Sequence, residues 1–121
     1  MNSKYDLEER LLEYAAAVTR VTEQLPASRA GNHIAGQLLR CGTSALPNHA
    51  EAQAAESRKD FIHKLRLCHK ELRESSRWLR LIRQIPLLEA SATADLLDET
   101  DELIRIFRAS INTASRNDVE R

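Results

Sequence analysis

Apolar side chains recur along this chain at alternating intervals of three and four residues, which gathers them on one side of an α-helix. Four segments show the pattern, which predicts helices over about residues 4–24, 28–55, 58–85 and 93–114. Each segment therefore has one face suited to burial against the others. The expected core stripes are Leu7, Leu11, Tyr14, Val18, Val21 and Leu25 in the first segment; Ile34, Leu38, Cys41, Ala45, Asn48 and Ala52 in the second; Phe61, Leu65, Cys68, Leu72, Ser75, Leu79 and Ile82 in the third; and Leu96, Thr100, Leu103, Phe107, Ile111 and Ala114 in the fourth.

Proline and capping residues mark the limits of these segments. Pro26 and Pro86 follow the first and third segments, and a proline disfavours helical backbone in the residue before it. Ser28 and Ser57 stand where an N-cap hydroxyl accepts a hydrogen bond from the first helical turn. Pro47 lies inside the second segment, where its ring and its missing N–H predict a kink.

Short connections make sequential helices antiparallel neighbours, so we expect an all-α, up-down-up-down antiparallel four-helix bundle. The length of 121 residues suits a single domain spanning 1–121. Only three glycines and three prolines interrupt the chain, and no segment shows the alternation typical of a β-strand. Gly36 and Gly42 fall within the second helix, where the lack of a side chain would let another helix approach closely.

The third segment carries a second stripe, one step out of phase with the first. Because one stripe serves one neighbouring helix, two stripes predict contact with more than one neighbour, within the chain or in another copy. Trp78 is expected to pack inside the chain, at a subunit interface or against a nucleobase. Glu71 and Glu74 are expected to flank the core and pair with arginines of another helix or subunit. The second stripe comprises Leu67, Glu71, Glu74, Trp78, Leu81 and Ile85.

The remaining face of the third segment is basic, although the whole chain has a formal net charge of zero. Residues 57–84 include nine basic and three acidic side chains, whereas residues 89–108 include six acidic and two basic ones. One interpretation pairs the basic helix with its acidic neighbours inside the bundle. The other makes the basic helix a surface for a polyanion, usually nucleic acid. The candidate nucleic-acid-binding residues are Arg66, Lys70, Arg73, Arg77 and Arg80.

Polar residues fall on or beside the predicted core stripes, namely Ser44, Pro47, Asn48 and Ser75. A buried polar group must find a hydrogen-bond partner, and polar residues in heptad cores can specify helix register. Pro47 also leaves one backbone carbonyl without its donor, which Asn48 or a neighbouring side chain is expected to supply. We therefore expect this group to fix helix register and the kink; a ligand pocket at the kink is the alternative.

The sequence lacks the patterns of catalytic and metal sites. A di-iron bundle needs Glu-x-x-His on two helices, and the chain has no such tetrapeptide. Neither Cys41 nor Cys68 belongs to a CxxC motif, and no P-loop or dinucleotide fingerprint occurs. We therefore expect no metal, no cofactor and no enzymatic activity. No apolar run reaches membrane-spanning length and the N-terminus lacks a signal-peptide core, so a cytoplasmic location without a membrane partner is expected.

Motifs in the middle of the chain resemble those of a known family. Residues 37–51 fit the pattern QLxRxxxSxxxNxAE, and a phenylalanine-led third helix follows. Together they resemble the four-helix-bundle proteins encoded in intervening sequences of bacterial 23S ribosomal RNA genes. The stretches that carry the resemblance are Gln37–Arg40, Ser44–Asn48, Ala50–Glu51, Ser57–Phe61, Lys70–Glu74 and Trp78–Leu79.

The resemblance implies a left-handed up-down bundle that often assembles into a ring-shaped homopentamer. Most family members have no established biochemical role. A distantly similar protein is an accessory factor of diversity-generating retroelements that binds a reverse transcriptase and nucleic acid. This chain departs from the family pattern at His49, where an aliphatic residue is common, and at Ala52, where glycine is common.

We therefore expect a non-enzymatic, self-assembling helical bundle, a pentamer by resemblance, that binds RNA or DNA through its third helix. The alternative is a protein-interaction scaffold or accessory subunit that binds no nucleic acid. The two hypotheses differ in what the basic helix contacts. Carboxylates across an interface would favour the scaffold, whereas exposed arginines without partners would favour nucleic-acid binding.

Overall fold

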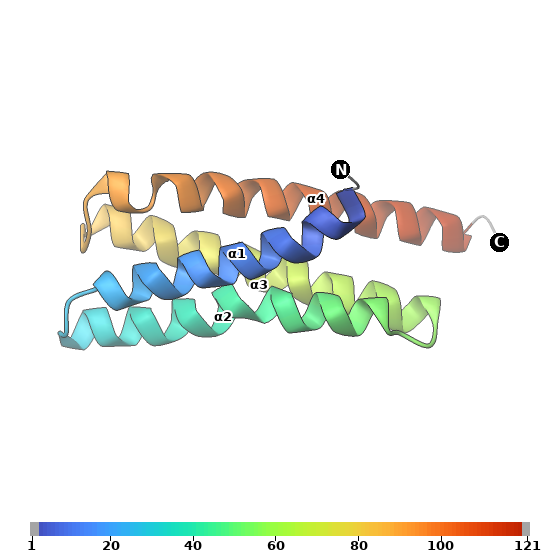
Figure 1. Cartoon of the computed structure of the whole chain (residues 1–121), viewed down its shortest axis with the longest axis horizontal. Helices are drawn as coiled ribbons and strands as arrows, with labels where there is room; N and C mark the ends of the chain where they lie inside the picture. The colour runs from blue at the N-terminus through green and yellow to red at the C-terminus, as the bar shows by residue number, and fades with distance from the viewer. Residues whose placement is uncertain (1–2, 120–121) are drawn as a thin grey trace.

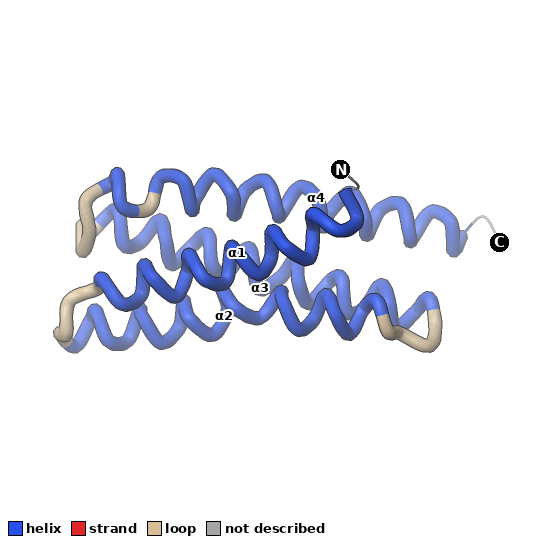
Figure 2. Tube along the Cα trace, in the orientation of Figure 1, coloured by secondary structure: helices blue, strands red, loops and turns tan. Residues whose placement is uncertain are grey.

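The structure, a computed structural model, describes residues 3–119, with side chains described for residues 7–116. The predicted domain of 1–121 thus includes two residues at each end that lie outside the described range. No strand occurs within the described residues (Figure 2), and the predicted all-α fold class is confirmed. The elements are α1 (Ser3–Gln24), α2 (Arg29–Gln53), α3 (Arg58–Gln84), the 3₁₀ turn η1 (Ala90–Ala92) and α4 (Ala94–Val119).

The helices run alternately up and down, as Figure 1 shows. The connection between α1 and α2 lies at one end of the bundle, that between α2 and α3 at the opposite end, and that between α3 and α4 at the first end again. Each helix packs against the next in chain order, and α1 packs more lightly against α4 to close the bundle. The left-handed twist and the kink at Pro47 stay predictions.

Serine side chains cap the starts of α2 and α3, as their sequence positions predict. The N–H of Gly31 donates to Ser28 Oγ at 3.0 Å, and the N–H of Asp60 donates to Ser57 Oγ at 3.1 Å.

The fourth helix differs from its prediction, because it continues to Val119 instead of ending near residue 114. No glycine or proline follows residue 114, so the sequence contains no residue that stops a helix there.

The four predicted stripes form one core, with one change of register in α2. Leu7, Phe61 and Ile111 are half-buried at the edges of the stripes. Asn48 is also half-buried, and the core position expected of it belongs to His49, which is only 4% exposed. A helix with 3.6 residues per turn drifts from a strict heptad, so a four-residue step here replaces the expected three-residue step.

Polar contacts connect α1 with α4, which pack against each other less extensively than the other neighbouring helices do. Thr100 donates its hydroxyl proton to the carbonyl of Leu96 at 2.7 Å, so Tyr14 must be the donor in its own 2.7 Å bond with Thr100. Burial raises the pKa of Tyr14 to about 12, which keeps the phenol protonated at neutral pH. Nearby, Arg10 makes a two-pronged salt bridge with Glu99, with N–O distances of 3.0 and 2.7 Å.

The close approach of α1 and α2 depends on Gly42. A Cβ atom added there would lie 2.5 Å from Val18 Cγ1, far inside van der Waals contact. A Cβ atom on Gly36 would meet nothing within 4 Å, because Gly36 is exposed. The predicted role in close helix approach is therefore confirmed for Gly42 and wrong for Gly36.

We expect Gly42→Ala to lower the free energy of unfolding by about 1–3 kcal/mol through overpacking, although the better helix propensity of alanine offsets up to about 1 kcal/mol. Gly36→Ala is the matched control and should stabilise the protein by up to about 1 kcal/mol. Urea denaturation followed by circular dichroism measures both changes. Equal stabilisation by the two substitutions would contradict the close approach at Gly42.

His49 is a titratable group inside the core. Its Nε2 lies 3.1 Å from the side-chain nitrogen of Gln53, and its ring meets Phe107 edge-on with the ring centroids 6.1 Å apart. An amide nitrogen only donates, so His49 Nε2 accepts and the neutral ring carries its proton on Nδ1. Burial lowers the pKa of His49, and the carboxylate of Glu8 opposes this effect.

The lowered pKa of His49 makes stability depend on pH. Above the unfolded pKa of about 6.5 the ring is neutral in both states and its full contribution is present. As the pH falls below that value, the unfolded chain takes up the proton first, so the free energy of unfolding should decrease until the folded ring also titrates. Urea denaturation at neutral and mildly acidic pH measures this decrease.

The His49→Leu variant should lose less stability on acidification than the wild type, because leucine fills the core without a proton to bind. His63→Gln, which alters an exposed histidine on α3, is the matched control and should behave as the wild type. An identical decrease in the wild type and His49→Leu would show that His49 does not cause the pH dependence.

Candidate nucleic-acid interface

The α3 helix presents two chemically different flanks, because it packs between α2 and α4. On the α2 flank lie Glu71, Glu74 and Trp78, each of which contacts a residue of α2. On the α4 flank lie Arg66 and Lys70, which line a cavity together with residues of α4. Glu71, Glu74 and Trp78 therefore lie on the flank opposite to the one on which Arg66 and Lys70 meet α4.

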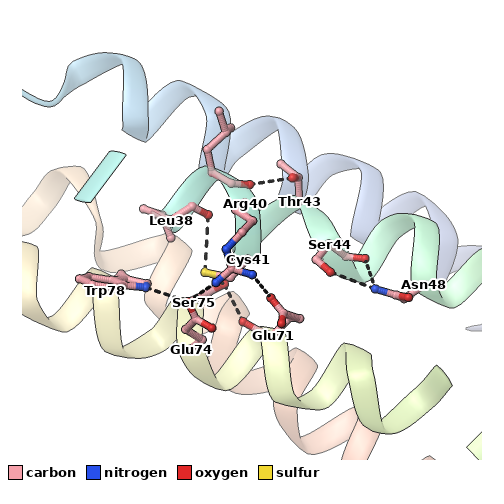
Figure 3. Close-up of polar contacts among 11 residues, drawn as sticks. Leu38, Arg40, Cys41, Thr43, Ser44, Asn48, Glu71, Glu74, Ser75 and Trp78 are labelled. Atoms are coloured by element: carbon pink, nitrogen blue, oxygen red, sulfur yellow. Dashed lines mark hydrogen bonds and ion pairs between the residues drawn. The ribbon is translucent and has the colours of Figure 1, made fainter. Parts of the chain in front are cut away.

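An arginine of α2 joins the two glutamates of the first flank (Figure 3). Arg40 Nη1 donates to Glu71 Oε2 at 3.0 Å, and Arg40 Nη2 donates to Glu74 Oε2. The side chain of Arg40 is 53% exposed, whereas those of Glu71 and Glu74 are 13% and 31% exposed. An ion pair this open to solvent stabilises a protein by roughly 0–1 kcal/mol, so it orients the α2–α3 seam more than it stabilises it.

Trp78 extends this contact toward the C-terminal end of α3. Its Nε1–H donates to Glu74 Oε2 at 3.1 Å, and its ring meets His33 of α2 edge-on with the centroids 5.9 Å apart. The hydrogen bond from Trp78, followed by the pairing with Arg40, lowers the pKa of Glu74. The half-buried indole thus has defined partners inside the chain.

The polar residues around Pro47 form a local contact on α2 (Figure 3). Asn48 Nδ2 donates to the carbonyl of Ser44 at 3.0 Å and lies 2.9 Å from Ser44 Oγ. Pro47 itself is exposed, and the carbonyl that its missing N–H would have met is that of Thr43. Asn48 therefore does not supply the donor that Pro47 removes; it caps the next carbonyl along the helix.

Ser75 lies fully buried on the core side of α3. Its hydroxyl is 2.9 Å from the carbonyl of Glu71 and 3.2 Å from Cys41 Sγ of α2 (Figure 3). Burial raises the pKa of Cys41 to about 11 and that of Cys68 to about 12. Thiols are nucleophilic as thiolates, so burial and the raised pKa disfavour reaction of these two in the folded protein. This cluster connects two helices and shows no feature of a nucleophilic site.

The five basic residues predicted to bind nucleic acid all lie exposed along α3. None of them pairs with a carboxylate among the side chains described. Arg77 makes only a 3.4 Å contact with the carbonyl of Arg73, one turn earlier. Ion pairs that form elsewhere include Arg10–Glu99, Arg40–Glu71, Arg40–Glu74, Lys64–Glu51 and Arg105–Glu102. The acidic side chains described for residues 7–116 therefore do not pair with these five cations.

A basic residue that the sequence did not indicate joins this surface. A cavity of about 510 Å³ lies between α3 and α4, where Arg108 faces Arg66 and Lys70. Arg108 belongs to a net acidic segment of the sequence, so the charge pattern gave no reason to place it beside the basic residues of α3. Its position directly after the core residue Phe107 was the available signal, since it places Arg108 at the edge of the helix seam. The cavity is lined by Arg66, His69, Lys70, Arg108, Ile111 and Asn112.

Among the described residues, no three or more histidine, cysteine, aspartate or glutamate side chains gather as metal ligands. Within the same part of the chain, no helix combines the length and the apolarity needed to cross a bilayer.

Comparison with known proteins places this geometry in a family. Residues 4–109 match the family of 23S rRNA-intervening sequence proteins. A crystal structure from Bacteroides thetaiotaomicron VPI-5482, of a protein with unknown function from the S23 ribosomal protein family, is 28% identical and superposes with a TM-score of 0.80, covering 86% of this chain and 96% of its own. No curated protein gives a significant match. The chain belongs to the family of 23S rRNA-intervening sequence proteins.

Proposed function

We propose that this protein is a non-enzymatic, self-assembling helical bundle of the cytoplasm that binds nucleic acid, RNA in particular, through the basic flank of α3. One observation carries the proposal: Arg66, Lys70, Arg73, Arg77 and Arg80 are exposed and have no carboxylate partner among the described side chains. Cations arranged in this way attract phosphates and release counterions on binding. The buried thiols and the absence of catalytic motifs in the sequence support a non-enzymatic role.

The spacing of the arginines suits contact with a phosphate backbone. Arg66, Arg73 and Arg80 are separated by two helical turns at each step, roughly 10 Å of helical rise. The sole tryptophan is engaged on the opposite flank, so α3 offers no aromatic platform on which bases could stack. Binding is therefore expected to depend on salt and to vary little with nucleotide sequence.

Exposed apolar side chains support self-assembly. Leu12 of α1 and Leu39 of α2 are exposed, as are Leu81 and Ile85 beyond Trp78 on α3. Exposed apolar side chains on different helices of one subunit suit head-to-tail contacts, which close into a ring when the rotation between subunits permits. A homopentamer is the ring that the resemblance to the family implies, and repetition of the basic flank around it would multiply the contacts with one nucleic acid.

A protein-interaction scaffold remains the second candidate, and the charges of α4 favour it. Asp98 and Asp101 are exposed on that helix. An acidic surface on one copy would complement the basic flank of α3 on another copy or on a different protein. In that case the arginines would be neutralised in the assembly and would have no phosphate to bind.

Self-assembly predicts a solution mass several times the 13.7 kDa of one chain, and five times that value for a pentamer. Ile85→Glu should reduce this mass, because it places a charge on the exposed end of the second stripe. Ala27→Glu is the matched control, since it adds the same charge at an exposed position outside the apolar stripes. Multi-angle light scattering at moderate salt decides the matter, and a wild-type mass near 13.7 kDa would refute self-assembly.

Nucleic-acid binding predicts that replacing Arg66, Arg73 and Arg80 together by glutamine weakens the affinity for RNA at least tenfold at low salt. Each phosphate contact on a single strand contributes about 0.7 to the slope of log K against log salt concentration, so the slope should fall by about 2. Fluorescence anisotropy with labelled single-stranded RNA and DNA at several salt concentrations measures both quantities.

The matched control replaces three arginines elsewhere by glutamine, namely Arg20, Arg29 and Arg116, which changes the net charge equally. This control should retain most of the affinity. If the two triple variants bind RNA equally while both stay assembled, or if the wild type binds neither nucleic acid at low salt, the scaffold function replaces the proposal.

A further inference from the structure

The cavity between α3 and α4 has the composition of an anion site. Three cationic side chains line it, Arg66 and Lys70 from α3 and Arg108 from α4, and Asn112 adds an amide one turn beyond Arg108. No carboxylate belongs to its lining. Two helices thus bring three positive charges to one hollow, and their mutual repulsion is relieved when an anion lies among them.

The imidazole of His69 responds to the charge of this cavity. His69 belongs to the lining, between Arg66 and Lys70 in the sequence. Burial, together with the charges of Arg108 and Arg73, lowers the pKa of His69. An anion bound in the cavity would counter those charges and raise the pKa of the ring.

We propose that this cavity is a phosphate subsite, in which Arg66, Lys70 and Arg108 hold one backbone phosphate of a bound RNA strand. This inference rests on the proposed function and makes it more specific, because it adds a residue of α4 to the surface.

Phosphate suits this cavity better than a protein carboxylate does. A guanidinium offers planar, paired donors that match a phosphate, and the Asn112 amide and the Lys70 ammonium can serve its remaining oxygens. Arg66, Arg73 and Arg80 follow one another on one side of α3, two helical turns apart at each step. An RNA strand with one phosphate in the cavity can therefore extend along α3 to Arg73 and Arg80. A single carboxylate from another chain would occupy the cavity but would not extend to Arg73 and Arg80.

The test compares Arg108→Gln with Arg20→Gln, which removes an exposed arginine of α1 and serves as the matched control. Arg108 is exposed, so its replacement should leave the fold and the assembled mass unchanged. With a short oligouridylate as the probe, Arg108→Gln should bind about tenfold more weakly, with a salt slope lower by about 0.7. Arg20→Gln should bind as the wild type does. In wild-type protein, NMR titration of the His69 ring should show a higher pKa with the oligouridylate than without it.

Three outcomes would overturn the subsite, and they differ in what they imply. If the wild type binds the oligouridylate but Arg108→Gln matches Arg20→Gln and the pKa of His69 does not rise, the subsite is wrong while the proposed function stands. If Arg108→Gln lowers the assembled mass without changing RNA affinity, a carboxylate of another chain occupies the cavity. If the wild type binds no oligouridylate at low salt, the proposed function and the subsite fail together.

Discussion

The rotation of α3 about its own axis decides what each flank of the molecule presents, and packing against α2 sets that rotation. Ser75 contacts Cys41, and Cys68 Sγ donates to the carbonyl of Ala45 at 3.6 Å, so these positions of α3 must face the core. The helical period then leaves the acidic and aromatic residues toward α2, Arg66 and Lys70 beside α4, and the other candidate nucleic-acid-binding residues exposed to solvent. A rotation by one residue, about 100°, would bury arginines without partners, which the core cannot accommodate.

This arrangement also explains why the five candidate nucleic-acid-binding residues of α3 have no carboxylate partner among the described side chains, although the chain holds as many acidic as basic residues. The acidic helix α1 packs against α2 and α4, so it shares no principal seam with α3. The carboxylate of Glu99 on α4 turns toward Arg10 of α1. On the seam that α4 does share with α3, it contributes Arg108 in place of an acid. The positive charges of α3 therefore lie apart from the negative charges of α1 and α4, although the two kinds are equal in number over the sequence.

The sequence was sufficient for those features that depend on helical period and local chemistry. The stripes, the serine caps and the close approach at Gly42 follow from spacing and residue type, and all appear in the structure. Features that depend on which helices share a seam could not be obtained in this way. His49 occupies the core position predicted for Asn48 because a helix of 3.6 residues per turn drifts from a strict heptad. The place of Arg108 in the basic surface could not be predicted without knowing that α3 packs against α4.

The two protonated thiols have a consequence for how the bundle can be observed. Cys41 and Cys68 lie on the two sides of the α2–α3 seam, and both are fully buried. A thiol reagent reaches them only when that seam separates, and the raised pKa of each slows its reaction until it meets water. The rate of thiol labelling therefore reports how often the α2–α3 seam opens. When the seam closes faster than the reagent reacts, this rate gives the free energy of opening between α2 and the basic helix α3.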